Sequence, residues 1–460
     1  MITHTLNRNL LLVIRLFIVI FCFLSSAFSR IGNISVEVGL CVAVYGIITF
    51  FTNYQFLIKY VALVTSAGLA IIGTFVIENS DIWLSELGTY SHNAGALSLI
   101  AGFYLLFLFT LEYMDSYLNK RNGEKRTLNI YFNQYNVINV FLKFFPILFF
   151  AITCVMCLRV LRHPAFLVNM DRFAYKEQYL QGIWGKLDNY YFYFVPILLM
   201  CWDLNKKKKL IVSIFSLYFL YLFLCGEKYG KFIVLIMFFS LYFVPTYIIK
   251  DKTVIKRLLK IIVAVFGITL VIILWQYSKY TWTTPVEHFQ QRIAQQGQLW
   301  WAIYDQQAES FPNVEEIYDE TSAFSENQEI YPYYGIYKIM FLTAPYNQVL
   351  SKIKTGSTYT ESSAASLYYY FGTGALIVFS VLMGIWFAFI AYKYVDYINR
   401  KCMIETMIII RLIYLGRAVL SNSAFNYYLG LDTAFTIVIW MICVLIRHSI
   451  CVNKKEAVTE

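Results

Sequence analysis

The side chains best suited to chemistry lie in a polar stretch from about residue 280 to 368, the one long part of the chain too polar for a bilayer. Within it, the segment from Glu287 to Trp301 concentrates ionisable, amide and indole groups. If this segment is helical, His288 and Arg292 lie on one face, because they are four residues apart. An arginine there can pair with phosphate oxygens. The candidates for a general base, which spacing does not rank, are Glu287, His288 and Glu361.

The elements that must position these groups are predicted to span a membrane. The chain has 460 residues, of which 59% are hydrophobic and only 14% charged, and its mean hydropathy is +0.57. A spanning helix needs about 20 mainly apolar residues. We therefore expect an all-α polytopic membrane protein with about twelve transmembrane helices. The predicted segments are 10–28, 35–52, 57–77, 95–114, 139–158, 189–204, 209–225, 231–249, 260–279, 368–392, 403–420 and 430–447.

These segments define the predicted organisation of the chain. Residues 1–279 carry helices one to nine, 280–367 form one large loop with short amphipathic helices, 368–447 carry helices ten to twelve, and 448–460 are a tail. Within the loop, residues 334–350 predict an amphipathic helix on the membrane face. Lysine and arginine in short loops mark the cytoplasmic side, which predicts cytoplasmic termini and an outward-facing large loop. The net charge of +10 is explained by these loops, so no nucleic-acid partner is expected.

The informative cations are those left on the outer side. Arg159 and Arg162 are three residues apart at the end of the fifth helix, which predicts one shared face. Lys228 and Lys231 stand at the start of helix eight, where free backbone N–H groups favour an anion. For each arginine, contact with lipid phosphates is the alternative, and exposed hairpin charges are the alternative for the lysines. The predicted diphosphate-binding residues are Arg159, Arg162, Arg172, Lys228, Lys231, Arg292 and Arg417.

Aromatic residues of the large loop predict a second kind of contact. Trp300, Trp301 and Tyr304 suit sugars, whose apolar faces stack on rings while their hydroxyls need polar partners. Anchoring at the membrane interface is the alternative for each ring. A ligand that carries a lipid tail, a diphosphate and a glycan would match the membrane segments, the outer cations and the aromatic loop together.

Three segments resemble the Wzy-type O-antigen polymerases of Gram-negative bacteria, whose overall plan the whole chain also shares. They are Gly226-Glu227-Lys228-Tyr229-Gly230, Gln291-Arg292-Ile293-Ala294-Gln295-Gln296-Gly297-Gln298-Leu299-Trp300-Trp301, and residues 356–363 leading into 367–372. The resemblance implies a metal-independent, cofactor-free glycosyltransferase of the C type in the inner membrane. It also implies an undecaprenyl-diphosphate-linked oligosaccharide as substrate, and a chain-length regulator as partner besides membrane lipids. Arg292 and Lys228 match the family's basic residues by motif, whereas Arg159, Arg162 and Arg417 are assigned by location.

The expected reaction is attack by a sugar hydroxyl on the anomeric carbon of a lipid-diphosphate glycan. Fixed cations would stabilise the charge that develops on the leaving diphosphate. Two alternatives stay open. An O-antigen ligase has the same class of activity and a similar topology. A lipid-linked glycan transporter commonly shows repeated halves and charges near the bilayer midplane, whereas this chain shows no internal repeat.

Overall fold

A computed structural model describes residues 2–29, 32–123, 136–165, 167–168, 172–204, 208–227, 230–246, 284–306, 335–354, 359–360, 362–422 and 433–445. The chain divides into two compact units. Unit 1 comprises Met1–Asp115, Val244–Ala388 and Leu415–Gly430. Unit 2 comprises Ser116–Phe243, Phe389–Tyr414 and Leu431–Glu460. Each unit is therefore assembled from three separate parts of the sequence.

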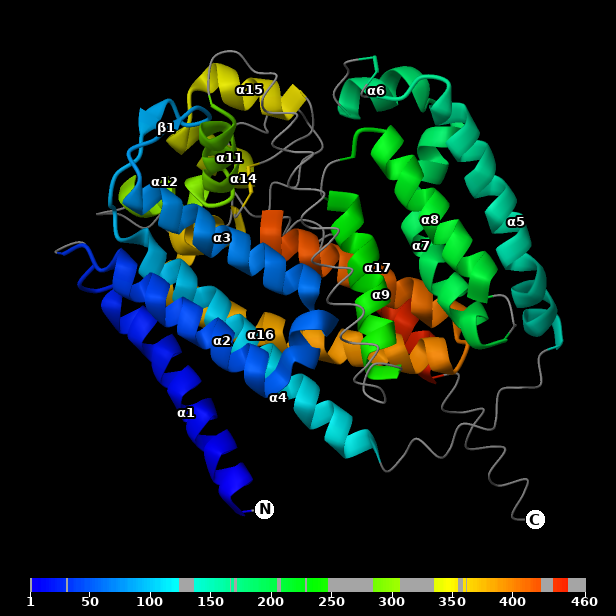
Figure 1. Cartoon of the computed structure of the whole chain (residues 1–460), viewed down its shortest axis with the longest axis horizontal. Helices are drawn as coiled ribbons and strands as arrows, with labels where there is room; N and C mark the ends of the chain where they lie inside the picture. Colours follow the sequence, from blue (N-terminus) through cyan, green and yellow to red (C-terminus); the bar gives the residue numbers. More distant parts are fainter. Residues whose placement is uncertain are drawn as a thin grey trace. The chain divides into compact units, whose positions relative to one another are not determined.

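Unit 1 begins with four helices that Figure 1 draws in blue and cyan: α1 (Ile2–Ser25), α2 (Ser35–Lys59), α3 (Val61–Asn79) and α4 (Ala96–Gly123), the last running past the unit boundary. A hairpin of β1 (Trp83–Leu84) and β2 (Thr89–Tyr90) lies between α3 and α4 in sequence. The later elements are α11 (Pro285–Ala294), α12 (Gln298–Gln306), α14 (Gly335–Thr343), α15 (Tyr346–Lys354) and the first part of α16 (Ser362–Asn399). The second part of α17 (Met403–Asn422) completes the unit.

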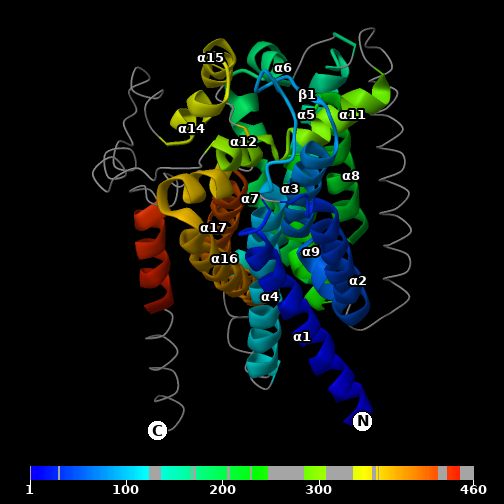
Figure 2. The same cartoon turned by 90° about the vertical axis from the view of Figure 1, so that its left-hand side faces the viewer.

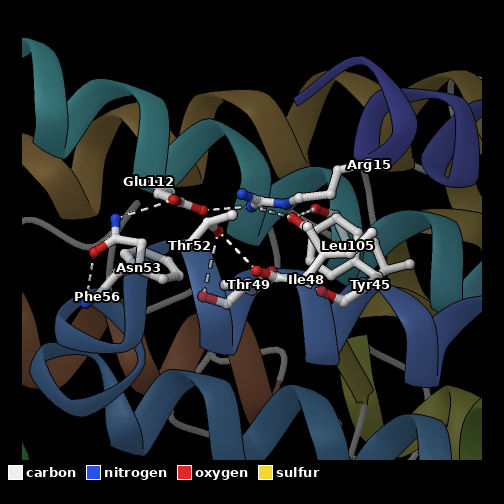
Figure 3. Close-up of polar contacts among 9 residues, drawn as sticks. All are labelled: Arg15, Tyr45, Ile48, Thr49, Thr52, Asn53, Phe56, Leu105 and Glu112. Carbon is white, nitrogen blue, oxygen red and sulfur yellow. Dashed lines mark hydrogen bonds and ion pairs between the residues drawn. The ribbon is translucent and has the colours of Figure 1, made fainter. Parts of the chain in front are cut away.

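Two ion pairs with little exposure, Arg15–Glu112 and Lys59–Asp115, join the first helices of unit 1. Arg15 of α1 pairs with Glu112 of α4 and donates to the Tyr45 hydroxyl of α2 at 3.0 Å. Asn53 interrupts α2 with non-helical dihedral angles, and its side-chain amide donates to the other Glu112 oxygen at 3.0 Å, as Figure 3 shows. A charge inside a membrane segment is costly unless it is paired. The pairing therefore accounts for a glutamate and an arginine among apolar helices.

Unit 2 is built on α5 (Asn136–Leu161), α7 (Ile183–Leu204) and α8 (Lys208–Leu224), with α6 (Arg172–Tyr179) and α9 (Gly230–Thr246). Helix α5 packs against both α7 and α8, and Figure 1 shows the three side by side. Their core is aromatic: the rings of Tyr191 and Tyr218 stack with centroids 3.5 Å apart, and Phe149 lies 4.7 Å from Tyr191. The Tyr394 hydroxyl of α16 donates to the Phe238 carbonyl of α9 at 3.2 Å and joins the late part of the sequence to this core.

Five helices of the described part of the chain are long and apolar enough to cross a membrane. They are Ser35–Lys59, Val61–Asn79, Ala96–Lys120, Val140–Leu161 and Ser363–Asn399. Large apolar side chains stay exposed on them, such as Phe51, Leu148 and Val378, as expected of helices whose outer surface meets lipid. The prediction of an all-α chain is confirmed, and five of its helices could span a membrane, as a multi-pass protein requires. The predicted segment 260–279 lies outside the described residues.

Two local predictions are corrected by the helix ends. Helix α5 ends at Leu161, so Arg162 lies on the turn beyond it and does not share a helical face with Arg159. The single helix predicted over residues 334–350 is two helices, α14 and α15, separated at Ala344 and Pro345. Proline lacks the backbone N–H and disfavours helical geometry in the preceding residue. This explains why α14 ends before Pro345.

Candidate functional site

Helix α11 carries three of the predicted site residues on a short, well-capped scaffold. The Thr284 hydroxyl accepts from the Glu287 backbone N–H at 3.2 Å, and the Glu287 carboxylate accepts from the Thr284 N–H at 3.0 Å. This reciprocal pair is a capping box, and Pro285 at the first helical position adds a preset φ angle. The segment is helical, which meets the condition set for His288 and Arg292: both lie within Pro285–Ala294, four residues apart.

The turn after α11 touches α3 backbone to backbone. A Cβ atom at Gly73 would lie 2.6 Å from the Ile293 carbonyl oxygen, and one at Gly297 would lie 2.5 Å from the Thr74 hydroxyl oxygen. Real side chains do not approach so closely, so both positions require glycine. The Thr360 hydroxyl donates to the Gln295 carbonyl in the same turn at 2.7 Å. The position of α11 is therefore fixed by contact with α3.

Helix α12 is buried along most of its length. Trp300, Trp301 and Tyr304 are 0%, 2% and 3% exposed. The Trp300 indole donates to the Ala96 carbonyl at 2.9 Å, and the Trp301 indole donates to the His92 carbonyl at 3.1 Å. These rings hold α12 against the start of α4 and offer no open face to a sugar in this conformation. Their predicted contact with a glycan stays a prediction.

The Arg292 side chain is exposed, unlike the aromatic rings of α12. Its guanidinium donates to the side-chain oxygen of Gln295, a neutral group, at 3.0 Å. That contact orients the guanidinium and leaves its positive charge in place. Glu287 is also exposed, with one carboxylate oxygen engaged in the capping box, and His288 is half-buried. Glu361 lies outside the described residues.

A second group of charges in unit 1 ties the hairpin to the large loop. Glu86, between β1 and β2, pairs with Lys352 of α15 at 2.8 Å and accepts from the Gln298 side-chain amide of α12. Its backbone carbonyl accepts from the Tyr359 hydroxyl at 3.1 Å. Burial and then the Glu86 charge raise the pKa of Tyr359, so this phenol remains a hydrogen-bond donor. We call residues 80–95, 284–306, 335–354 and 359–360 the loop layer.

Unit 2 contains an ionic cluster with buried carboxylates. It joins α6, α7 and the start of α9. Lys231, at the start of α9, pairs with Asp188 of α7 at 2.5 Å and lies 3.7 Å from Glu227. Lys176 of α6 pairs with Glu227 and lies 3.4 Å from Asp188. The Tyr221 hydroxyl also donates to Asp188, at 3.2 Å. Burial lowers the pKa of Lys176, but Asp188 and Glu227 outweigh it, and the pKa ends above its ordinary value.

This ionic cluster balances two lysines with two carboxylates. Lys231, predicted to bind diphosphate, is already held by Asp188 and Glu227, whose side chains are each 2% exposed. In the sequence, Glu227 stands directly before Lys228 and four residues before Lys231. Asp188 opens an apolar run, and no local pattern in the sequence indicates that it meets Lys231. Lys228, the other lysine predicted to bind diphosphate, lies outside the described residues.

The predicted arginines of unit 2 have more open surroundings. Arg159 is exposed; its guanidinium donates to the Tyr179 carbonyl at the end of α6 at 3.2 Å and lies over the Trp184 ring at 5.2 Å. Arg162 is exposed on the turn after α5. Arg172 is the first residue of α6. Arg417 belongs to unit 1, where it is half-buried on α17. Among the predicted cations, Arg159, Arg162 and Arg292 therefore have exposed side chains.

The comparisons with known proteins add one match. The model of a family of unknown function (DUF6418) matches residues 332–444. The matched part runs from α14 to the late helix that includes Thr433–Leu445, and it contains Arg417 and Glu361 but not α11. No curated protein and no solved structure matches the chain.

Proposed function

We propose that the chain is a membrane glycosyltransferase that polymerises oligosaccharide repeat units carried on undecaprenyl diphosphate, acting at the periplasmic face of the inner membrane. The observation that carries the proposal is the exposed Arg292 guanidinium, held by the neutral amide of Gln295 on a capped helix that is fixed to α3. A fixed guanidinium with its charge intact suits a diphosphate, which presents paired oxygens to its planar fork. The resemblance around Arg292 supplies the reaction class.

In the proposed reaction, a hydroxyl oxygen of the acceptor repeat unit forms a bond to the anomeric carbon of the donor glycan. The bond from that carbon to the diphosphate oxygen breaks, and its electron pair leaves with the lipid diphosphate. The hydroxyl proton passes to a base, for which Glu287 and His288 of α11 are the candidates among the described residues. Negative charge grows on the diphosphate as the bond breaks, and Arg292 would lower the barrier by stabilising it.

Both substrates of such a polymerase carry a diphosphate, so two anion sites are needed. Arg292 is proposed for one of these sites, and Arg159 and Arg162, which are also exposed, are candidates for the other. A ligase has one diphosphate substrate and needs one such site. The presence of candidates for two sites favours the polymerase over the ligase, and a chain-length regulator would be its partner.

The deciding experiment is a gel of lipopolysaccharide from a strain that lacks this chain. If the chain is the polymerase, the lipid A core keeps a single repeat unit and the ladder of longer chains disappears. If the chain is the ligase, no repeat unit is attached. A strain that keeps its full ladder would overturn both. Complementation with the wild-type gene and with Arg292→Ala assigns the effect to the proposed site.

A further inference from the structure

We infer that the β1–β2 hairpin is a saccharide-binding subsite in which Trp83 and Tyr90 stack on a sugar ring. This subsite rests on the proposed function in one respect, that a glycan is the substrate. Three features of the hairpin support it: the exposure of the two rings, the contacts that hold the hairpin in place and the polar groups beside it.

The two rings form an exposed aromatic pair. Trp83 and Tyr90 are directly opposite one another in the antiparallel ladder, so their side chains project from the same face of the hairpin. They are 43% and 62% exposed, and their ring centroids lie 4.9 Å apart at an interplanar angle of 66°. Trp300 and Trp301, by contrast, are almost fully buried. Exposed rings are the ones that can cover the apolar face of a sugar.

The hairpin is held in place on the side opposite the rings. Leu84 and Leu87 are buried, and the Ile82 N–H donates to the Ser91 hydroxyl at 2.9 Å. The Gln348 side chain of α15 donates to the Ser85 carbonyl at 3.0 Å, beside the Lys352 and Glu86 pair. A two-stranded hairpin alone is barely stable, so these contacts from the loop layer fix the rings before a ligand arrives. Preorganisation of this kind lowers the entropic cost of binding.

Polar groups suited to sugar hydroxyls lie next to the rings in the sequence and in the fold. His92, two residues after Tyr90, contacts Asp305 of α12 at 3.1 Å, and the two side chains are 54% and 36% exposed. The His92 ring packs against Trp301 with centroids 4.8 Å apart, which fixes its orientation. Asp81, two residues before Trp83, is exposed as well. Carboxylate and imidazole groups both pair with hydroxyls.

Anchoring of Trp83 and Tyr90 at lipid headgroups is the competing explanation. Figures 1 and 2 both show β1 beyond the end of α3, at the level of α11 and α15. The hairpin's contacts there are to the polar side chains Gln298, Gln348 and Lys352 of the loop layer. A ring pair on a hairpin that this layer holds belongs with the part of unit 1 that carries Arg292, and a sugar is the ligand that fits this polar layer.

The test measures binding of oligosaccharide fragments released from the surface polysaccharide of the producing strain, free of lipid and diphosphate. The full chain in lipid nanodiscs is titrated with these fragments and followed by saturation-transfer NMR. Trp83→Ala with Tyr90→Ala should weaken binding about tenfold or more, whereas Trp83→Phe with Tyr90→Phe should stay within about threefold of wild type because rings remain. Tyr113→Ala, which removes a ring 60% exposed on α4, should bind as wild type does. Wild-type binding by the double alanine variant would overturn the subsite and favour headgroup anchoring.

A second measurement covers the case in which the double alanine variant does not fold. Asp81→Cys places a thiol at an exposed position two residues before Trp83, and saturating fragments should slow its reaction with a maleimide relative to the same variant without fragments. An unchanged labelling rate would also overturn the subsite.

The two proposals can fail separately. Because the fragments lack a diphosphate, Arg292→Ala should bind them as wild type does. If the deletion strain keeps its ladder while the fragments still bind at the hairpin, the polymerase is wrong and the subsite stands. If the ladder is lost but the double alanine variant binds normally, only the subsite is wrong.

Discussion

The ionic cluster of unit 2 and helix α11 of unit 1 use cations in opposite ways. In the ionic cluster, Lys176 and Lys231 are held by Asp188 and Glu227, so the charges cancel inside the protein. On α11, Arg292 is exposed and its guanidinium contacts a neutral amide. The first arrangement uses its charges within the fold, whereas the second leaves a positive charge at the surface. A lysine or arginine thus indicates an anion site only when its carboxylate neighbours are also known.

The largest expected effect is on the stability of the ionic cluster. Asp188→Asn would leave two lysines facing one carboxylate, and breaking a buried pair in this way typically costs about 3–5 kcal/mol. We expect a marked fall in the melting temperature of the detergent-solubilised protein. Asp188→Asn combined with Lys231→Met restores the balance between Lys176 and Glu227 and should recover much of the loss. If the double variant is no more stable than the single one, charge balance is not what the cluster provides.

The next effect is on activity and concerns Arg292. Arg292→Ala should lower the rate of polymerisation by about a hundredfold or more, as the loss of one preorganised donor commonly does, while the melting temperature stays close to that of the wild type. Arg292→Lys keeps the charge but loses the planar fork, so partial activity is expected. Lys354→Ala removes an exposed cation of α15 and serves as the matched control. Both rates are measured with purified protein and lipid-linked oligosaccharide; a normal rate in Arg292→Ala excludes this residue from the reaction.

A smaller effect tests whether the placement of α11 matters apart from its charge. Gly297→Ala puts a methyl group into the Thr74 contact, and such overpacking costs about 1–3 kcal/mol. Arg292 remains present but displaced, so polymerisation should fall along with stability. Gly374→Ala is the control, because nothing lies within 4 Å of a Cβ there. Equal activity in the two variants would show that α11 tolerates displacement.

The smallest expected effect is local. Thr284→Ala removes one half of the capping box of α11 and should cost about 1 kcal/mol. Amide hydrogen exchange should quicken in the first turn of α11 and stay unchanged in α12, which is held by its buried rings. Thr284→Ser keeps the hydroxyl and should exchange like the wild type. Uniform quickening across both helices would mean that α11 and α12 open as one unit.

The sequence was sufficient to predict most helices, because a run of about 20 apolar residues has few other uses. It also indicated that His288 and Arg292 would lie on one face if their segment were helical, and the segment is helical. It did not predict that Trp300 and Trp301 would be buried while Trp83 is exposed, since a tryptophan in a polar loop can serve either a core or a surface. Asp188 and Lys231, which form an ion pair, are 43 positions apart in the sequence. Pairings of this kind depend on how helices pack, and the local pattern of hydrophobic residues does not encode them.

The interruption of α2 at Asn53 gives that helix a kink. The side-chain oxygen of Asn53 accepts from the Phe56 backbone N–H at 3.2 Å, where a new helical segment starts. The side-chain amide N–H of Asn53 donates to Glu112. An uninterrupted helix transmits a bending force along its whole length, whereas a kinked helix bends at the kink. The Glu112 carboxylate, which accepts from Asn53 at the kink, also pairs with Arg15 of α1, as Figure 3 shows. Substitution of Glu112 would remove a contact of Asn53 and a contact of Arg15 in a single event.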